Sequence, residues 1–319
     1  MSQKLAIDVG HGFTKALSET GERVLFPSLI CPMLPHVDLG ELGKSEAVTI
    51  DGVPYLVGES ARQHATPLWS RDKADDPDTL RLMLIAAAQL GAVGPVQLAT
   101  GLPLAWYGAQ RKAFREALTG FGGMVQLPGQ SVQRRLWFES VKVLPQGLAA
   151  SLGLLTHVDR EPGDYLVVDL GYRTTDYLVV TKESTGHLAF DPLAAGSLEL
   201  GTHAIASRLA SELEHAYAVP FTPSEVEKSE RIFVDGQAIV LSGRRAAVIQ
   251  AIQQQLGAKI TETLDARVRK LSATVVCGGG ASVLSEAFTH PVIPPDPQWA
   301  NVAAYLQAFS PAIDGIPHP

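Results

Sequence analysis

The feature that most constrains this fold is a short pattern that occurs twice, about half a chain apart. The first copy is LAIDVGHGFTK, residues 5–15, and the second is LVVDLGYRTTDYLVV, residues 166–180. Each copy is a β-branched or apolar run that ends in an aspartate, turns at a glycine, and returns to strand-like residues. The sequence therefore predicts the same strand–turn–strand hairpin twice, and with it two related lobes.

Such a hairpin is suited to holding a phosphate group. Glycine lets the backbone approach a ligand closely, and turn N–H groups can face phosphate oxygens. An aspartate at a strand end, such as Asp8 or Asp169, can hold Mg²⁺ through water. A single copy would more simply be a tight turn with a capping aspartate. Two matched copies favour the phosphate interpretation.

A third block has three adjacent glycines at the end of a strand. Residues 273–277 read as a buried strand, and Gly278, Gly279 and Gly280 lead into a helix start at residues 281–285. Adjacent glycines at a strand-to-helix turn bring backbone against a flat or anionic ligand, and the helix N-terminus adds a favourable dipole. The alternative is a helix start capped by Ser282. The block has neither of the spaced glycine patterns of dinucleotide or P-loop sites.

A fourth block lies between the two hairpins. Pro145 and Gly147 interrupt a strand, and the alanine-rich residues after them favour a helix that packs closely. Gln146 is the polar side chain at the mouth of this helix, where it could orient a water molecule. The alternative is an ordinary polar loop residue.

Composition sets the class of protein. The 319 residues are enough for about two domains, and the net charge of −7 disfavours direct binding of DNA or RNA. Cys31 and Cys277 match no metal-ligand spacing and are expected to be reduced thiols. We expect a cytoplasmic protein without a membrane anchor, because the sequence shows no secretory signal and its longest apolar stretch, residues 83–94, is too short to span a bilayer.

Taken in order, the four blocks resemble the actin-like ATPase superfamily. They match its phosphate 1, connect 1, phosphate 2 and adenosine motifs, and together they span nearly the whole chain. Three further segments resemble the ParM/StbA group of plasmid-segregation actins: TGLPL at 100–104, DLGYRTTD at 169–176 and PPDPQWANV at 294–302. The resemblance implies an α/β fold of two lobes with duplicated, ribonuclease H-like topology and a nucleotide cleft between them. It places lobe I at 1–162 plus 290–319, with a small inserted subdomain at about 32–75, and lobe II at 163–289.

The resemblance also implies roles for individual residues. Asp8 and Asp169 would organise Mg²⁺ through water, and Gln146 would orient the attacking water. Asp176 would either hold these side chains in place or have a purely structural role. The residues expected around the phosphates are Gly10, His11, Gly12, Phe13, Thr14, Lys15, Gly171, Tyr172, Arg173, Thr174 and Thr175. Those expected on the nucleoside side are Gly196, Glu225, Lys228, Gly278, Gly279, Gly280 and Ser282.

Two positions depart from the common motifs. Tyr172 and Arg173 stand where many relatives have small glycines, so fewer bare amides would reach a phosphate there. Arg173 could supply charge instead, or face solvent. His11 is bulky for the first turn and is expected to be structural.

The function that the resemblance implies is ATP or GTP hydrolysis, with Mg²⁺, coupled to self-assembly into filaments. Such filaments would segregate plasmid DNA through a DNA-binding adaptor at the plasmid centromere, with no direct contact to nucleic acid or membrane. Two alternatives stay open: a non-motile scaffold of the cell-division or pilus type, and a small-molecule kinase of the same superfamily. The kinase lacks a convincing substrate base near Gly101.

Overall fold

The computed structural model describes residues 2–33, 47–66, 68, 70–156 and 161–310. The chain divides into two compact units, which we call unit 1 (Met1–Gly153 with Trp299–Pro319) and unit 2 (Leu154–Gln298). Unit 2 is longer at both ends than the range 163–289 expected from the sequence. The glycine-rich segment 34–45, expected at the edge of an inserted subdomain, lies outside the described residues.

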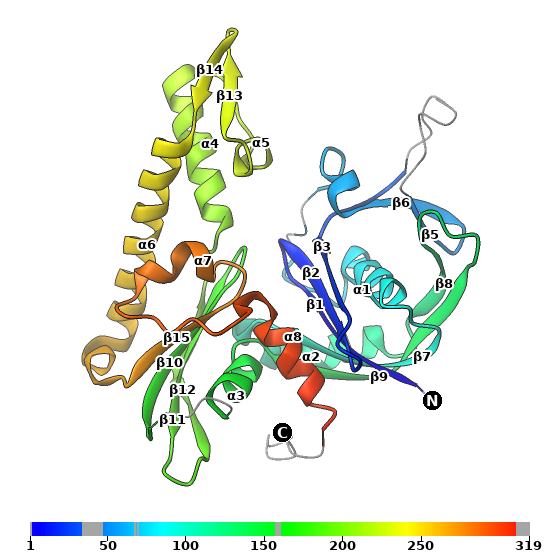
Figure 1. Ribbon diagram of the computed structural model, residues 1–319, viewed down its shortest axis with the longest axis horizontal. Coiled ribbons are helices and arrows are strands. Elements are labelled where there is room, and N and C mark those ends of the chain that lie inside the picture. Colours follow the sequence, from blue (N-terminus) through cyan, green and yellow to red (C-terminus); the bar gives the residue numbers. More distant parts are fainter. Residues whose placement is uncertain (1, 34–46, 67, 69, 157–160, 311–319) are drawn as a thin grey trace. The chain divides into compact units, whose positions relative to one another are not determined.

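In the described part of unit 1, nine strands form one sheet in the order β3-β2-β1-β7-β9-β8-β5-β6-β4. Figure 1 shows this sheet curving around helix α1. The strands are β1 (Gln3–Val9), β2 (Phe13–Ser18), β3 (Arg23–Pro27), β4 (Ile30–Pro32), β5 (Val48–Ile50), β6 (Val53–Val57), β7 (Gly94–Leu102), β8 (Gly122–Gln126) and β9 (Arg134–Pro145). The helices are η2 (Gly58–Ala61), α1 (Pro77–Gln89), α2 (Leu104–Leu118), α3 (Leu148–Thr156, which continues into unit 2) and α8 (Ala300–Gln307).

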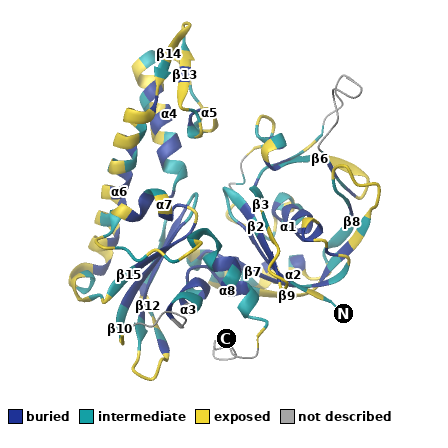
Figure 2. Cartoon of the chain, in the orientation of Figure 1, coloured by how far each residue is buried: buried dark blue, intermediate teal, exposed yellow. Residues whose placement is uncertain are grey.

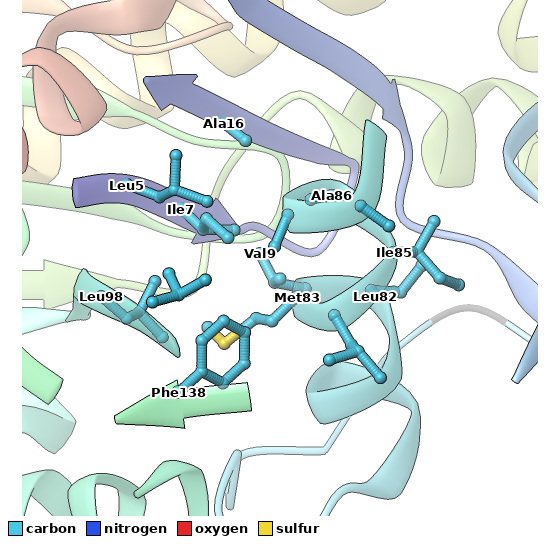
Figure 3. Packing of buried hydrophobic residues seen from close by; sticks show 14 of the residues in the cluster. Leu5, Ile7, Val9, Ala16, Leu82, Met83, Ile85, Ala86, Leu98 and Phe138 are labelled. Carbon is cyan, nitrogen blue, oxygen red and sulfur yellow. The ribbon is translucent and has the colours of Figure 1, made fainter. Parts of the chain in front are cut away.

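Alternation along β1 builds the main core of unit 1. Successive side chains of a strand point to opposite faces, so Leu5, Ile7 and Val9 share one face. They join the cluster formed with the buried side of α1, including Met83, and with Phe138 of β9. Figure 3 shows the Met83 sulfur beside the Phe138 ring. Residues 83–88 of the apolar stretch 83–94 thus lie on a buried helix.

The other face of β1 carries Ala6 and, two residues later, Asp8. Ala6 packs with Ala149 of α3 and with Val302 and Tyr305 of α8. The C-terminal helix therefore returns to unit 1 and covers the sheet face to which Asp8 belongs.

In the described part of unit 2, four strands form a sheet in the order β12-β11-β10-β15, and β13 and β14 form a separate hairpin. The strands are β10 (Gly163–Leu170), β11 (Thr175–Lys182), β12 (Leu188–Leu198), β13 (Arg231–Val234), β14 (Gln237–Val240) and β15 (Ala273–Cys277). The helices are α4 (His203–Tyr217), α5 (Pro223–Glu227), α6 (Ser242–Leu264), η3 (Asp265–Lys270), α7 (Ala281–Leu284) and η4 (Ser285–Ala287), with η5 (Pro297–Trp299) at the passage to unit 1.

Helix α6 carries the buried stripe of unit 2. Val248, Ile252, Leu256, Ile260 and Leu264 recur every four residues and are all buried. This spacing keeps them on one side of a helix, and Figure 2 shows that side dark and the opposite side exposed. They pack in one cluster with Leu166, Val168 and Leu170 of β10.

The two sheets contain the same four-strand arrangement. In unit 1, β1 pairs antiparallel with β2 and parallel with β7, and β2 pairs antiparallel with β3. In unit 2, β10 pairs antiparallel with β11 and parallel with β15, and β11 pairs antiparallel with β12. The duplicated α/β topology predicted from the repeated hairpin is therefore present.

Helix α7 differs from the expectation in two respects. It is only four residues long, and its N-cap is Gly280 without a side-chain cap bond. Ser282 lies inside the helix, so the suggestion that it caps the helix is wrong. A single turn also leaves little of the helix dipole expected at this glycine turn.

Of the helices that the structure describes, none combines the length and apolar character needed to cross a membrane.

Candidate functional site

The two hairpins close with the same turn. The Gly10 N–H donates to the Phe13 carbonyl at 3.1 Å, and the Gly171 N–H donates to the Thr174 carbonyl at 2.9 Å. A Cβ on Gly10 would lie 3.1 Å from the Phe13 oxygen, and one on Gly171 would lie 2.7 Å from the Thr174 oxygen. The second turn therefore has no room for a side chain two residues after the aspartate, and the first would have to shift by a few tenths of an ångström to accept one.

In unit 1, the hairpin register places Lys15 directly opposite Asp8. The Lys15 ammonium lies 2.8 Å from Asp8 Oδ2. The Gln146 amide nitrogen donates to Asp8 Oδ1 at 2.9 Å, and both side chains are buried. Asp8 thus contacts one residue of its own motif and one residue predicted from a separate motif.

A second lysine, Lys73, reaches the same place from the segment before α1. It is only 4% exposed, and its ammonium donates to the Val9 carbonyl at 2.6 Å. Burial by itself raises the pKa of the Asp8 carboxyl. The charges of Lys15 and Lys73 and the hydrogen bonds from Lys15 and Gln146 outweigh burial, so the Asp8 pKa lies below its ordinary value of 3.8. We call these four side chains, Asp8, Lys15, Lys73 and Gln146, the Asp8 cluster.

The remaining side chains of the first hairpin serve mainly its packing. The Thr14 hydroxyl is fully buried and shares a hydrogen bond of 2.9 Å with Ser28, so it does not fit the expected contact with a phosphate. The Gly12 carbonyl accepts from the Ser28 N–H at 3.0 Å. The His11 ring lies edge-to-face with Trp106 at 5.8 Å between centroids, which agrees with a structural role.

In unit 2, the register places Asp176 directly opposite Asp169, and Ser197 opposite Asp176. Ser197 donates a hydrogen bond to Asp176. Both aspartates are buried, so the second hairpin has a carboxylate where the first has Lys15. The Thr175 hydroxyl donates to the Leu200 carbonyl at 2.6 Å, so, like that of Thr14, it is bound by a residue of its own unit that lies outside the hairpin.

The three glycines of the turn after β15 have different surroundings. Gly278 is buried with a φ of +89°, and a Cβ there would lie 2.5 Å from the Leu170 carbonyl oxygen and nearer still to Asp169 Oδ1. Gly280 donates to the Leu170 carbonyl at 2.8 Å. Gly279 is exposed, with its nearest neighbour at 3.6 Å. The glycine turn is thus packed directly beneath Asp169, and only Gly279 is open.

Tyr172 and Arg173 have partners within unit 2. The Tyr172 hydroxyl and His203 Nδ1 are 3.1 Å apart, and Arg173 lies 3.6 Å from a Glu199 carboxylate oxygen. Burial lowers the pKa of His203, Glu227 raises it and Arg173 lowers it further, with a net lowering. The start of α4 also faces this turn, since the His203 N–H donates to the Tyr172 carbonyl at 2.8 Å.

Other residues predicted for the nucleoside side have local explanations. Gly196 lies in β12, where a Cβ would be 2.7 Å from the Tyr177 hydroxyl oxygen. The Glu225 carboxylate accepts from the Thr222 N–H at 2.6 Å in a capping box, and its pKa is lowered by the Thr222 hydroxyl and N–H. Lys228 and Ser282 are exposed.

Two residues of this region were not predicted from sequence. Lys73 belongs to no motif, and its charge would suggest a solvated residue. Asn301 accepts a hydrogen bond of 3.1 Å from the Gly147 N–H, next to Gln146. The only hint of Asn301 was its place in the segment 294–302, which resembles the ParM/StbA group.

The comparisons with known proteins agree with the duplicated topology. The family described as actin-like proteins, N-terminal domain, matches residues 6–148. The family described as archaeal actin homologue MreB-like, C-terminal, matches residues 167–290. The chain belongs to the actin-like superfamily.

Individual actin-like proteins are similar over nearly the whole chain. An archaeal actin homolog from Thermoplasma volcanium is 26% identical, covering 95% of this chain and 98% of its own. A ParM filament structure from Clostridium botulinum superposes with a TM-score of 0.82 at 19% identity, covering 96% of this chain and 98% of that one. The archaeal actin homolog Ta0583 in complex with ADP gives 0.76 at 22% identity, covering 96% and 98%.

Among the described residues, no group of three or more histidine, cysteine, aspartate or glutamate side chains is arranged to hold a metal ion directly. Mg²⁺ in phosphate sites usually keeps several waters and takes only one or two carboxylates. A single buried aspartate, such as Asp8 in unit 1 or Asp169 in unit 2, fits that pattern.

Proposed function

We propose that this chain binds ATP or GTP with Mg²⁺, hydrolyses it, and couples hydrolysis to assembly into actin-like filaments. We further propose that these filaments segregate plasmid DNA through a DNA-binding adaptor. The single observation that carries the enzymatic part is the Asp8 cluster. Its residues come from three separate segments of the sequence. Lys15 and Gln146 contact Asp8 at 2.8 and 2.9 Å, and Lys73 contacts the adjacent Val9 carbonyl at 2.6 Å.

The charge of the Asp8 cluster favours an anion. The ammonium groups of Lys15 and Lys73 both lie in a largely buried place, where positive charge attracts phosphate oxygens. Charges act more strongly there than in water, because the effective dielectric constant is lower. Fixed positive charge beside a transferring phosphoryl group is the main way in which proteins stabilise that transition state.

The orientation of Gln146 supports its proposed catalytic role. A carboxylate only accepts hydrogen bonds, so the Gln146 NH₂ group must face Asp8. The amide oxygen is then turned the other way and can accept a hydrogen bond from a water molecule. We propose that Asp8 holds Gln146 so that this oxygen orients the attacking water.

The two aspartates would hold the metal through water, Asp8 from the first hairpin and Asp169 from the second. Mg²⁺ would neutralise charge on the phosphate oxygens when bound. The glycine turns at Gly10 and Gly171 bring backbone close to a phosphate, and the open Gly279 is the member of the third turn that a nucleoside could reach. Arg173 would add positive charge if it left Glu199.

The proposed assembly draws support from the similar proteins. One of them is a ParM described as a 15-stranded filament, and another is an archaeal actin homolog described in complex with ADP. The net charge of −7 supports an adaptor, because a chain that moves DNA without a basic surface needs a basic partner.

The test combines light scattering, electron microscopy and phosphate release after addition of ATP or GTP with Mg²⁺. We expect filaments with at least one nucleotide, and for Gln146→Ala we expect filaments with hydrolysis slowed about a hundredfold. Gln126→Ala is the matched control, because the Gln126 amide also donates one hydrogen bond, to the Gln130 carbonyl at 2.7 Å, but lies outside the cluster. Absence of scattering with both nucleotides would refute assembly, and parental hydrolysis by Gln146→Ala would refute its role.

A further inference from the structure

The turn that carries Gln146 is held from the C-terminal helix. Asn301, the second residue of α8, is 6% exposed, and its side-chain oxygen accepts from the Gly147 N–H at 3.1 Å. On the other side of the turn, the Gln146 N–H donates to the Leu102 carbonyl at 2.8 Å. The backbone that carries Gln146 is therefore fixed at two consecutive N–H groups, one bound by β7 and one by α8.

The Gly147 N–H needs this partner. Gly147 is buried with a φ of +71° and directly precedes helix α3, whose first N–H groups have no partner within the helix. A buried N–H without an acceptor is costly. If the acceptor were lost, the turn would shift toward another acceptor and move Gln146 with it.

Asn301 is itself held firmly. Its neighbour Trp299 lies under the Arg23 guanidinium at 5.0 Å. Val302 and Tyr305 are fully buried against the sheet. The acceptor thus belongs to a helix that is packed along its length, and it can define the position of the turn rather than follow it.

From these contacts we infer that Asn301 is a positioning residue for Gln146. By fixing the Gly147 N–H, it sets the place from which the Gln146 amide reaches Asp8 and turns its oxygen toward the attacking water. The inference rests on the proposed function for its catalytic consequence. The placement of Gln146 can be tested without nucleotide.

A purely structural role for Asn301 makes a different prediction. If Asn301 only satisfied a buried N–H group, its loss would lower stability but leave the Gln146–Asp8 contact as it is. A positioning role requires that this contact change. The side-chain amide of Gln146 is therefore the decisive observable.

The first experiment follows the Gln146 side-chain NH₂ signals by ¹⁵N–¹H NMR in nucleotide-free full-length protein, with the signals identified by their absence in Gln146→Glu. In Asn301→Ala we expect them to move to the positions typical of solvated glutamines. In Asn301→Asp, which keeps an acceptor of the same shape, we expect them to stay near their parental positions. Parental signals in Asn301→Ala would overturn the inference.

A control separates position from stability. Val302→Ala removes buried methyl groups from the neighbouring residue of α8, so it should lower the melting temperature as core truncations do. It does not touch Gly147, and we expect unchanged Gln146 signals. If Val302→Ala moved these signals as Asn301→Ala does, general loosening of α8 would explain both and the inference would fail.

The second experiment measures hydrolysis and nucleotide affinity. We expect Asn301→Ala to lower kcat about tenfold with little change in nucleotide Kd, and Asn301→Asp to restore most of the rate. In a Gln146→Ala background, Asn301→Ala should not lower kcat any further, because Asn301 acts through the Gln146 side chain, which is absent there. A further tenfold loss in that background would overturn the inference. If Gln146→Ala itself hydrolysed normally, the proposed function would fail, while the NMR result would still decide whether Asn301 places Gln146.

Discussion

Gly278 gives the sharpest stability prediction, because its neighbour Gly279 provides a matched control. The two glycines are adjacent in one turn, but Gly278 is buried with a φ of +89° and Gly279 is exposed without a positive φ. Replacement by alanine adds the same methyl group at both positions. Only at position 278 does the fold have no room for it.

The expected magnitudes follow from the surroundings. At Gly278, a left-handed backbone costs an L-residue about 1–2 kcal/mol. The methyl group would also lie 2.5 Å from the Leu170 carbonyl oxygen, and overpacking of this kind costs about 1–3 kcal/mol. Gly278→Ala should therefore lose about 2–5 kcal/mol. Gly279→Ala, 3.6 Å from its nearest neighbour, should be neutral or gain about 0.4–1 kcal/mol from the restricted unfolded chain.

The assay is urea unfolding followed by two probes. The three tryptophans that the structure describes, Trp106, Trp137 and Trp299, lie in unit 1, whereas Gly278 lies in unit 2. At about 1–3 kcal/mol per molar urea, Gly278→Ala should move the circular dichroism midpoint of unit 2 down by roughly 1–3 M. The tryptophan midpoint of unit 1 should move less, because the altered turn is not part of its core.

Equal unfolding midpoints for Gly278→Ala and Gly279→Ala would refute this reasoning. The turn would then be able to relax away from Asp169 and Leu170 without cost.

Two further predictions concern the Asp8 cluster. Lys73→Met should weaken nucleotide binding at least about tenfold by calorimetry, because it removes one of the two positive charges beside Asp8. Lys142→Met is the control, because the Lys142 ammonium also donates to a carbonyl, at 2.7 Å, but is exposed. Equal affinities of the two variants would contradict the prediction. The lowered pKa of Asp8 stabilises the fold above the ordinary pKa of 3.8, and this contribution is lost as the pH falls through the lower folded pKa. Asp8→Asn should therefore be less stable than the parent protein near neutral pH and should lose less stability than the parent on acidification, as measured by thermal unfolding from pH 7 to 2. Parallel curves of melting temperature against pH for parent and variant would show that Asp8 is not the titrating group.

Much of the site could be predicted because its residues lie in local patterns. Asp8 with Lys15, and Asp169 with Asp176, are paired by the register of a hairpin, and a hairpin is short enough to read from alternation and a turn glycine. Each depends on neighbours within about twenty residues.

The contacts that were missed join residues far apart in the chain. Lys73 lies in a segment without a motif, and only packing shows that its ammonium reaches the Val9 carbonyl. Thr14 and Thr175 were assigned to the phosphates by the resemblance to the actin-like motifs. In the structure their hydroxyls bind Ser28 and the Leu200 carbonyl, which lie outside the two hairpins.

The sequence by itself determined that this protein has two related lobes, each with an aspartate at a strand end and a glycine turn. The alternation of apolar residues and the turn glycine involve only neighbouring residues of the chain. The occurrence of the same pattern twice is what pointed to two related lobes. Only the tertiary structure decided which side chains meet: Gln146 turns its NH₂ group to Asp8, Lys73 adds the second buried charge, and Asn301 holds the turn beneath Gln146. These contacts span between about 60 and 150 residues of chain, and no local pattern carries them because they exist only once the sheet and its covering helices have packed.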